Sequence, residues 1–279
     1  MKTYNKIQEL QNELQAQRNQ GKTIGFVPTM GALHQGHISL VHQARAACDI
    51  VVVSIFVNPI QFNNPEDLKK YPRTYEADAK LLEEATCDYI FYPTVGEMYP
   101  EKVTKKYDFG NLETVMEGAF REGHFNGVGV VVNKLFEIVN ADKAFFGKKD
   151  FQQLAIIRSL VEIENLSVEI IAGETMRECD GLAMSSRNVR LTEEERTFAP
   201  EIFSTLNWVK ENMENHSPIE LMEVAMKRLS VHFKPEYFQI VDGLSLQMIN
   251  SWDETNYPVA CVAAHLGQVR LIDNIELNR

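Results

Sequence analysis

The chain has 279 residues and a formal net charge of −11, with 28 basic side chains against 39 acidic ones. This balance argues against a nucleic-acid partner, because proteins that bind tRNA or DNA normally carry a basic surface. No apolar run reaches the ~18 residues of a membrane-spanning helix, and the N-terminus lacks the apolar core of a signal peptide. Four widely spaced cysteines without a Cys-x-x-Cys pair fit reduced thiols. We therefore expect a cytoplasmic globular protein with no membrane partner.

The first elements along the chain are a helix, a strand and a second helix. Residues 4–19 carry apolar side chains at helical spacing, which predicts an amphipathic helix that packs on a sheet. Residues 23–27 form a short apolar run, which predicts a buried strand. From Ile38 onward the apolar positions again have a helical period. Residues 28–37 are therefore expected to form the loop of a βαβ unit, where open α/β folds place their ligands.

This loop ends in the sequence His-Gln-Gly-His, residues 34–37, at the start of the second helix. Free backbone N–H groups and the positive end of the helix dipole attract an anion at such a position. Because His34 and His37 are three residues apart, both could reach one phosphate group. Two alternatives are a pair of surface histidines and a zinc site, although no third ligand stands at metal spacing.

The whole run Pro-Thr-Met-Gly-Ala-Leu-His-x-Gly-His, residues 28–37, resembles the signature of the pantothenate synthetase family, within the nucleotidyl-transferase superfamily. The resemblance extends to about Arg187. It implies an α/β fold with a Rossmann-like, doubly wound parallel sheet that binds ATP. The ATP contacts that it implies in this loop are Met30, Gly31, Ala32, Leu33, His34, Gln35, Gly36 and His37.

The next predicted strand, residues 49–57, is a nearly continuous apolar run, which is typical of a central parallel strand. The loop after it carries Asn58 and Gln61. The side-chain amide of Gln61 can donate and accept hydrogen bonds, which suits a hydroxy acid or a carboxylate; a polar loop residue without a ligand is the alternative. A similar family stretch, Phe-Val-Asn-Pro-x-Gln-Phe, holds pantoate, and the resemblance implies substrate contacts for Asn58 and Gln61.

A helix is expected over residues 75–85, with Thr74 as its N-cap, and a strand over residues 88–92. Asp78 matches a family position near the metal and the phosphates, so the resemblance makes it the expected metal contact. The neighbouring family position is often a second carboxylate, but here it is Ala77. A magnesium contact through two carboxylates is therefore left open.

A long apolar helix is expected over residues 128–139, after a stretch with a cation, a histidine and two glycines. From the residues alone this stretch is equally well explained as a capped loop. The resemblance implies a flap that closes over the site, with Arg121 and His124 as substrate contacts.

A second junction of strand, glycine, lysine and helix follows the short strand expected over residues 143–146. Free N–H groups beside ammonium groups suit the phosphates of ATP, whereas two solvated lysines that cap a helix are the alternative. The stretch closely resembles the family's Phe-Phe-Gly-x-Lys-Asp-x-Gln-Gln, which assigns the phosphates to Lys149, the ribose to Asp150 and pantoate to Gln153. The ATP contacts implied here are Gly147, Lys148, Lys149 and Asp150.

A third polar loop comes after the strand expected over residues 166–171, which residues 175–177 extend. Its two hydroxyls and one guanidinium suit triphosphate oxygens. It resembles the Lys-Met-Ser-Lys-Ser loop of class I aminoacyl-tRNA synthetases, and the implied ATP contacts are Met176, Met184, Ser185, Ser186 and Arg187. We expect the three loops to meet at one edge of the sheet, where one triphosphate could touch all of them.

The composition then changes to that of a small α+β domain. Helices are expected after Thr192 and Ser217, and Pro200 is expected to interrupt the first or start another. Strands are expected over residues 237–241, 259–264 and 269–275, with a hairpin turn at Gly267-Gln268. The predicted organisation is a Rossmann-like domain for ATP and pantoate over residues 1–177 and a smaller α+β domain over residues 178–279, which acts as a lid.

From the residues alone we predict an ATP-binding α/β enzyme of the nucleotidyl-transferase type. The resemblance implies that ATP joins (R)-pantoate to β-alanine through a pantoyl adenylate, with Mg²⁺ on the phosphates, in a homodimer. His34, His37 and Lys149 would be catalytic by stabilising charge on the phosphates, and His37 could also donate a proton. Three rivals are an adenylyltransferase for a phosphorylated acceptor, a tRNA-charging enzyme and a non-catalytic ATP sensor.

Overall fold

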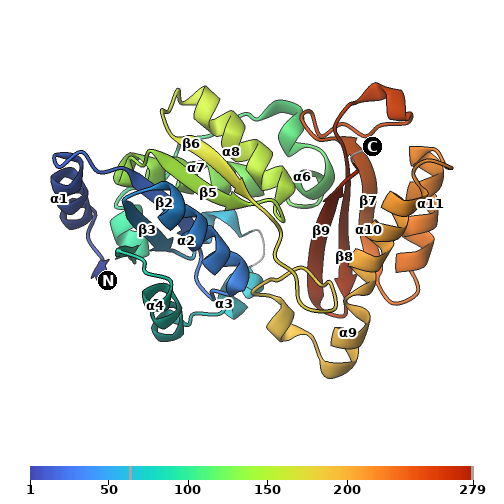
Figure 1. Cartoon of the computed structure of the whole chain (residues 1–279), viewed down its shortest axis with the longest axis horizontal. Helices are drawn as coiled ribbons and strands as arrows, with labels where there is room; N and C mark the ends of the chain where they lie inside the picture. The colour runs from blue at the N-terminus through green and yellow to red at the C-terminus, as the bar shows by residue number, and fades with distance from the viewer. Residues whose placement is uncertain (63–64, 278–279) are drawn as a thin grey trace. The chain divides into compact units, whose positions relative to one another are not determined.

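The computed structural model describes residues 1–62 and 65–277 (Figure 1). Its contacts divide the chain into two compact units. The first unit consists of Met1–Phe109, Arg121–Lys148 and Gln153–Glu174, and the second of Gly110–Phe120, Lys149–Gln152 and Thr175–Arg279. The long segment of the second unit thus begins three residues before the boundary predicted at 178, and two short earlier segments join it. The role of this unit as a lid stays a prediction.

The first unit contains a six-stranded parallel sheet in the order β1-β4-β3-β2-β5-β6, which confirms the expected α/β fold. Its central strands are the apolar runs of the sequence, which are buried along most of their length. The strands are β1 (Lys2–Tyr4), β2 (Ile24–Thr29), β3 (Ile50–Ile55), β4 (Tyr89–Phe91), β5 (Lys143–Gly147) and β6 (Glu169–Gly173).

Helices pack on both faces of this sheet because its side chains alternate between two apolar faces. Val27, Val51 and Val53 belong to one hydrophobic cluster with the buried face of α2 (Gln35–Ala47), which crosses the sheet in Figure 1. On the other face, the ring of Phe26 lies 6.4 Å from that of Phe136 in α7. The other helices with residues in this unit are α1 (Ile7–Arg18), α3 (Pro65–Lys70), α4 (Tyr75–Glu84), α5 (Val95–Met98), α7 (His124–Val139) and α8 (Phe151–Ile163).

The strand order reverses its direction at β2, which lies between β3 and β5. The chain leaves β2 toward β3 on one side, whereas β5 leads to β6 on the other. Open α/β sheets bind ligands at such a switch point, beyond the carboxyl ends of the strands. The loop that follows β2 is therefore placed where a ligand site is expected.

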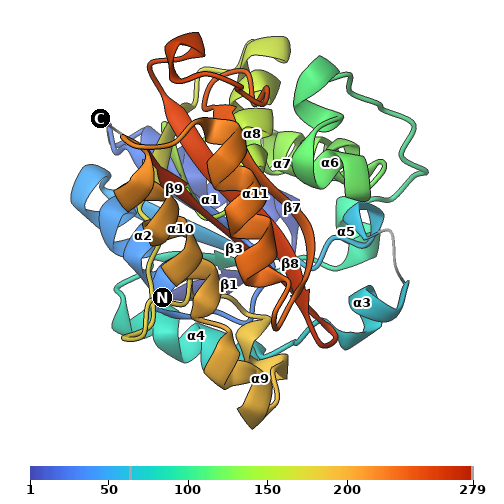
Figure 2. The ribbon, with the colours of Figure 1, turned by 90° about the vertical axis from the view of Figure 1, so that its right-hand side faces the viewer.

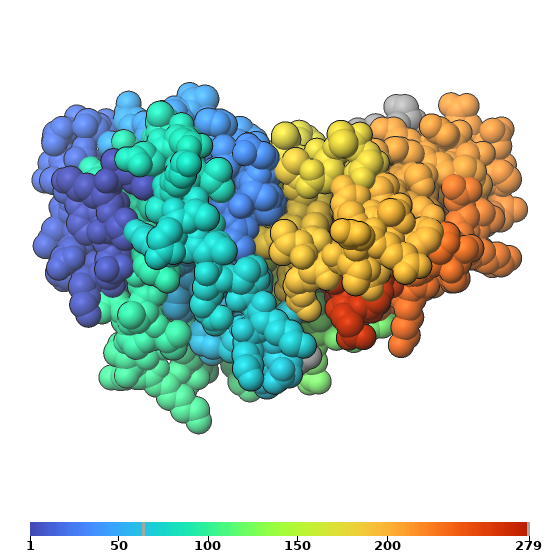
Figure 3. All heavy atoms as spheres, turned by 90° about the horizontal axis from the view of Figure 1, so that it is seen from below, coloured from blue at the N-terminus to red at the C-terminus, as the bar shows by residue number. Residues whose placement is uncertain are grey.

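Several elements differ from the sequence-based expectation. The edge strand β1 was not predicted, and it pairs with β4. The N-terminal segment, dark blue in the space-filling view, lies beside later residues of the first unit, drawn in blue-green (Figure 3). One contact between them is a hydrogen bond from the N–H of Ile7 to Glu97. The helix α7 begins at His124, four residues before the expected start. Residues 175–177 do not extend β6, because only Arg177 forms a bridge, with Ala183.

The second unit is built on an antiparallel sheet in the order β7-β8-β9, with α10 and α11 across one face (Figure 2). Its strands are β7 (Lys234–Asp242), β8 (Pro258–Leu266) and β9 (Val269–Glu276), and its helices are α6 (Met116–Phe120), α9 (Glu193–Phe198), α10 (Glu201–Asn212) and α11 (Pro218–Leu229). The expected strands, the helix starts after Thr192 and Ser217 and the hairpin turn are confirmed. The early segment is attached by buried Glu117, which accepts a hydrogen bond of 2.6 Å from Arg270.

Candidate active site

The loop between β2 and α2 places two imidazole rings side by side at the N-terminus of α2. His34 is the N-cap of this helix, and His37 occupies its third position. The ring centroids lie 4.1 Å apart with an angle of 48° between the planes. The two rings are therefore neighbours, and their common contact with one phosphate group stays a prediction.

Backbone hydrogen bonds orient both rings. Nδ1 of His34 accepts from the N–H of Gly36 at 3.2 Å, and Nδ1 of His37 accepts from the N–H of His34 at 3.3 Å. In a neutral imidazole one nitrogen donates and the other accepts, so these contacts put the proton on Nε2 of each ring. Each histidine can then present an Nε2–H donor at a helix end that already favours anions.

The buried carboxylate of Asp78 holds the same loop from α4. One of its oxygens accepts from the N–H of Ala32 at 2.9 Å, and the other from the N–H of Leu33 at 2.8 Å. Ala32 has a φ of 51°, which is uncommon for a residue with a β-carbon. Gly31 has a φ of 83°, and a β-carbon there would lie 3.0 Å from the Asp78 carboxylate. Asp78 thus keeps the loop in a strained conformation, and its predicted metal contact stays a prediction.

The side-chain amide of Gln61 is held in a defined orientation after β3. Gln61 ends the short 3₁₀ helix η1 (Pro59–Gln61) and is 7% exposed. Its Oε1 accepts from Nδ2 of Asn58 at 3.1 Å, while its Nε2 donates to the sulfur of Met30 at 3.0 Å. A thioether is a weak acceptor, so this N–H group can be transferred to a stronger oxygen acceptor of a substrate.

Asn58 itself is fully buried, and all of its side-chain polar groups have partners. Its Nδ2 donates to Gln61 and to the carbonyl of Gly127, and its Oδ1 accepts from the hydroxyl of Tyr99 at 3.0 Å. The resemblance implied a direct contact between Asn58 and the substrate. That contact stays a prediction, and the hydrogen bond to Gln61 also suits an indirect effect of Asn58 through Gln61.

The N-terminal turn of α7 packs tightly against the loop that carries Gln61. Nδ1 of the buried His124 lies 2.8 Å from the carbonyl oxygen of Gln61. A β-carbon at Gly127 would lie 2.6 Å from the carbonyl oxygen of Ile60 and 2.7 Å from Cα of Gln61, so only glycine fits. His124 therefore supports the backbone of this loop. Arg121 accepts a backbone hydrogen bond from His124, and its predicted substrate contact stays a prediction.

The junction between β5 and α8 carries the second predicted group, Gly147 to Asp150. The ammonium of Lys148 forms an ion pair of 2.6 Å with Glu174. Lys149 has no ion-pair partner within 4.0 Å among the described residues, and its backbone carbonyl accepts from Nδ2 of Asn274 at 2.9 Å. Lys149 is thus the lysine of this pair that is better suited to bind a phosphate.

The next two residues on α8, Gln152 and Gln153, have different roles. Gln153 is partly exposed, as a substrate contact requires. Gln152 is 4% exposed, and its carboxamide accepts from the N–H of Glu117 and donates to the carbonyls of Leu112 and Val115. This function of Gln152 was not predicted, and the one signal for it in the sequence is the adjacent Gln-Gln pair.

The third predicted group lies on a hairpin of the second unit. The N–H of Met184 donates to the carbonyl of Met176 at 2.9 Å, beside the bridge between Arg177 and Ala183. The hydroxyl of Ser185 then accepts from the N–H of Arg187 at 3.3 Å. Residues 184–187 are all partly exposed, as ATP contacts must be. This hairpin and Lys149 share the second unit, whereas the histidines are in the first, so the meeting of the three loops stays a prediction.

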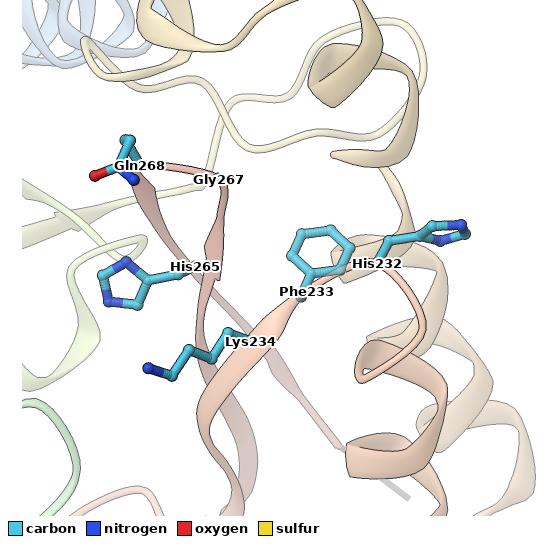
Figure 4. A pocket seen from close by; sticks show the side chains of 6 residues that line it. All are labelled: His232, Phe233, Lys234, His265, Gly267 and Gln268. Atoms are coloured by element: carbon cyan, nitrogen blue, oxygen red, sulfur yellow. The ribbon is translucent and has the colours of Figure 1, made fainter.

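A pocket of about 540 Å³ in the second unit is lined by residues that were not predicted as site residues, namely His232, Phe233, Lys234, His265, Gly267 and Gln268 (Figure 4). His265 and Lys234 point to the same side of the sheet there. Each histidine at this pocket is already engaged by a glutamate, His265 by Glu236 at 2.8 Å and His232 by Glu201 at 2.9 Å. We assign no ligand to this pocket.

No group of three or more His, Cys, Asp or Glu side chains in the described parts of the chain is arranged to hold a metal ion. The described residues thus give no support to a zinc site at the histidine pair. Within residues 1–62 and 65–277, no helix combines the length and the hydropathy that are needed to cross a bilayer.

Comparisons with known proteins match the chain over its whole length. The chain is 52% identical over 278 residues to the pantothenate synthetase of Porphyromonas gingivalis, with 99% of each chain covered. The crystal structure of pantothenate synthetase from Thermus thermophilus matches with a TM-score of 0.94, 40% identity and 100% coverage of each chain. Pantoate-beta-alanine ligase from Francisella tularensis, complexed with beta-gamma ATP and beta-alanine, matches with a TM-score of 0.84, 35% identity and coverage of 99% and 98%. The model of the pantoate-beta-alanine ligase family matches residues 2–276, and the chain therefore belongs to this family.

Proposed function

We propose that the chain performs its ligase reaction with three loops, residues 30–37, 147–150 and 184–187. The enzyme is an AMP-forming ligase that condenses (R)-pantoate with β-alanine in the biosynthesis of pantothenate and coenzyme A. Because a carboxylate is a poor electrophile, the reaction needs two steps. In the first, a carboxylate oxygen of pantoate bonds to the α-phosphorus of ATP and pyrophosphate leaves. In the second, the amine of β-alanine attacks the acyl carbon, and AMP and a proton leave.

The two histidines carry this proposal. Both Nδ1 atoms accept backbone hydrogen bonds, so both Nε2–H groups can donate to phosphate oxygens. Negative charge is redistributed over these oxygens as pyrophosphate leaves, and donors that are already oriented stabilise that charge without reorganisation. His37 also has the chemistry to give a proton to the departing oxygen.

Lys149 and the hairpin of residues 184–187 supply the other phosphate contacts in this proposal. An ammonium without a close anionic partner can bind a phosphate without first breaking an ion pair. Hydroxyls and a guanidinium suit the oxygens of the pyrophosphate, which the guanidinium can bind with two parallel hydrogen bonds. Asp150, beside Lys149, is proposed to bind the ribose.

Pantoate is proposed to bind to the carboxamides of Gln61 and Gln153. The orientation of Gln61 supports this assignment, since its oxygen is fixed by Asn58 and its N–H group has only a weak acceptor. A hydroxy acid offers both hydroxyl and carboxylate oxygens to such a donor. His124 and Asn58 would contribute by keeping Gln61 in place.

We propose that ATP binds as its magnesium complex. Mg²⁺ prefers octahedral oxygen ligands and is often bound by phosphates, water and only one or two carboxylates. The described residues fit that mode, because they contain no cluster of three or more His, Cys, Asp or Glu side chains that could hold the ion. Asp78 would offer a single carboxylate, and both of its oxygens already accept backbone hydrogen bonds. The ion would then be held mainly by the ATP phosphates, whose charge it would partly neutralise.

We also propose that the enzyme is a cytoplasmic homodimer. The family resemblance supports the dimer, and light scattering of the purified protein would test it. Free cysteines suit a reducing compartment, and Cys48, Cys87, Cys179 and Cys261 are all free.

The experiment that tests the reaction is an omission series. Protein is mixed with magnesium, ATP, pantoate and β-alanine, and each component is left out in turn while AMP and the amide are measured. We expect equal amounts of AMP and pantothenate in the complete mixture and neither product without pantoate. AMP that stays attached to an acceptor, or nucleotide binding without any AMP release, would contradict the ligase reaction.

A further inference from the structure

Two adjacent residues of β9, Asp273 and Asn274, connect this strand to both ATP-binding elements of the second unit. Both side chains are buried, at 3% and 7% exposure. They lie on the last strand of the chain, more than a hundred residues from Lys149. Neither residue belongs to a motif of the sequence that was expected to bind ATP or pantoate.

Asp273 anchors the base of the hairpin that carries residues 184–187. Its two oxygens accept hydrogen bonds of 2.6 Å and 3.0 Å from the guanidinium of Arg177, in a bidentate ion pair. Arg177 also donates to the carbonyl of Gly181, and its backbone forms the bridge to Ala183 at the start of the hairpin. The ring of Phe203 lies 3.7 Å from the guanidinium carbon and completes its support.

Asn274 anchors the other element. Its Nδ2 donates to the backbone carbonyl of Lys149 at 2.9 Å. Lys149 stands in the turn between β5 and α8, next to Lys148, whose backbone N–H donates to the carbonyl of Gly173 at 2.8 Å. The backbone N–H of Asn274 donates to Oδ1 of Asp273 at 2.8 Å, so the two anchoring residues are also linked to each other. One strand therefore fixes both the hairpin and the turn of Lys149.

We propose that Asn274 is a positioning residue for adenylate formation, which acts by holding the backbone of Lys149. The proposal rests on the phosphate-binding role of Lys149 given above. Because the same strand holds the hairpin through Asp273, the ammonium of Lys149 and the Ser185–Arg187 groups keep a fixed spacing within the unit. Such spacing matters for the step that expels pyrophosphate, since misplacement by about 1 Å can cost ~100-fold in rate. The attack of β-alanine on the adenylate does not depend on it.

The test separates the two half-reactions in Asn274→Ala and Asn274→Asp, which both lack the donor. Asn274→Asp keeps the shape of the side chain, which guards against a folding defect in Asn274→Ala. Pantoate-dependent exchange of pyrophosphate into ATP reports the first step, and the reaction of preformed pantoyl adenylate with β-alanine reports the second. We expect exchange to fall by ~10-fold or more in both variants, with the second step unchanged. The thermal midpoint should fall because a partly buried hydrogen bond is lost, but it should stay above the assay temperature. Asn250→Ala, at an exposed asparagine of the same unit, serves as the matched control.

The Lys149→Ala variant separates the positioning role of Asn274 from the phosphate-binding role of Lys149. It should lower the exchange rate, and Asn274→Ala should lower it no further in that background. Unchanged exchange in Asn274→Ala, or an equal loss in both half-reactions, would overturn the positioning role while leaving Lys149 as a phosphate ligand. Unchanged exchange in Lys149→Ala would instead remove the role of Lys149, and the inference with it.

Discussion

The carboxylate of Asp78 accepts a hydrogen bond of 2.9 Å from the backbone N–H of Ala32, a residue with a φ of 51°. This contact holds the loop before the two histidines in a conformation that costs energy by itself. Asp78 could therefore support activity either by binding the metal ion or by holding the backbone of this loop. The two roles can be separated, because only the loss of a metal ligand should be compensated by excess magnesium.

We expect Asp78→Asn to lower activity, and we expect excess magnesium not to restore it. The amide would place an N–H group against one of two backbone donors, and an unsatisfied buried donor costs about 1–3 kcal/mol. The measurement is the apparent KM for ATP as magnesium is raised to saturation. Recovery of activity at high magnesium would instead assign Asp78 to the metal.

The Gln61→Ala substitution should weaken the binding of pantoate more than the binding of ATP. The Gln61 amide donates to a weak acceptor, the sulfur of Met30, and is therefore available to a substrate oxygen. Removing the amide would remove that substrate hydrogen bond, which is worth about 0.5–1.5 kcal/mol. Asn58→Ala should show the same selectivity, and the double variant should be no worse than Gln61→Ala. Separate KM values for pantoate and ATP give the answer, with Gln20→Ala as an exposed control. An equal loss for both substrates would place Gln61 outside the pantoate site.

His37→Ala should lower turnover by more than ~100-fold while the fold remains intact. The reason is the loss of an oriented Nε2–H donor at the end of α2. The natural control is His42→Ala, an exposed histidine on the same helix. Turnover and circular dichroism are measured on both variants, and a loss of only a few-fold in His37→Ala would show that the His-x-Gly-His assignment is wrong.

Gly127→Ala should impair pantoate binding indirectly, by displacing the loop that carries Gln61. The added β-carbon would meet the carbonyl of Ile60 at 2.6 Å, so α7 and the Gln61 loop must separate. Overpacking of this kind typically costs about 1–3 kcal/mol of stability. We expect a lower thermal midpoint and a raised KM for pantoate. Gly96→Ala is the matched control, since a β-carbon at Gly96 meets nothing within 4 Å.

Low pH should lower the stability of the fold partly through protonation of Glu13 in α1. Hydrogen bonds from Tyr89, Gln17 and Tyr4 lower the pKa of Glu13 from 4.5 to about 2. A carboxyl group whose pKa is lower in the folded state stabilises the fold above pH 4.5 and loses that contribution as the pH falls toward 2. We expect the thermal midpoint of Glu13→Gln to fall less than that of the parent across this interval. Parallel curves for the two proteins would contradict the assignment.

Elements with a strong local signal could be predicted from the sequence. The strand β3 is a nearly continuous apolar run, and α2 begins within a histidine and glycine motif that is expected to start a helix and to bind an anion. The edge strand β1 could not be predicted, because three mostly exposed residues have no periodicity and their partner is β4, far along the chain. The early start of α7 was hidden by Gly127 and Gly129, which lower helix propensity but are required by close packing.

The candidate site divides in the same way. Residues inside compact motifs, such as His34, His37 and Lys149, could be named from the sequence. Residues that act on them from a distance could not, because the contact between Asn274 and Lys149 spans 125 positions and leaves no local pattern. The clamp by Asp78 depends on the left-handed backbone of Ala32, which no residue type at that position indicates.

The chain passes between its two units after residues 109, 120, 148, 152 and 174. A chimera that exchanged only the C-terminal segment with a relative would therefore pair a foreign Arg270 with the original Glu117, and a foreign Asn274 with the original Lys149. Engineers who recombine such ligases should transfer residues 110–120 and 149–152 together with the tail. A fragment that begins at Thr175 would likewise leave the partly buried side chain of Arg270 without one of its two acidic partners.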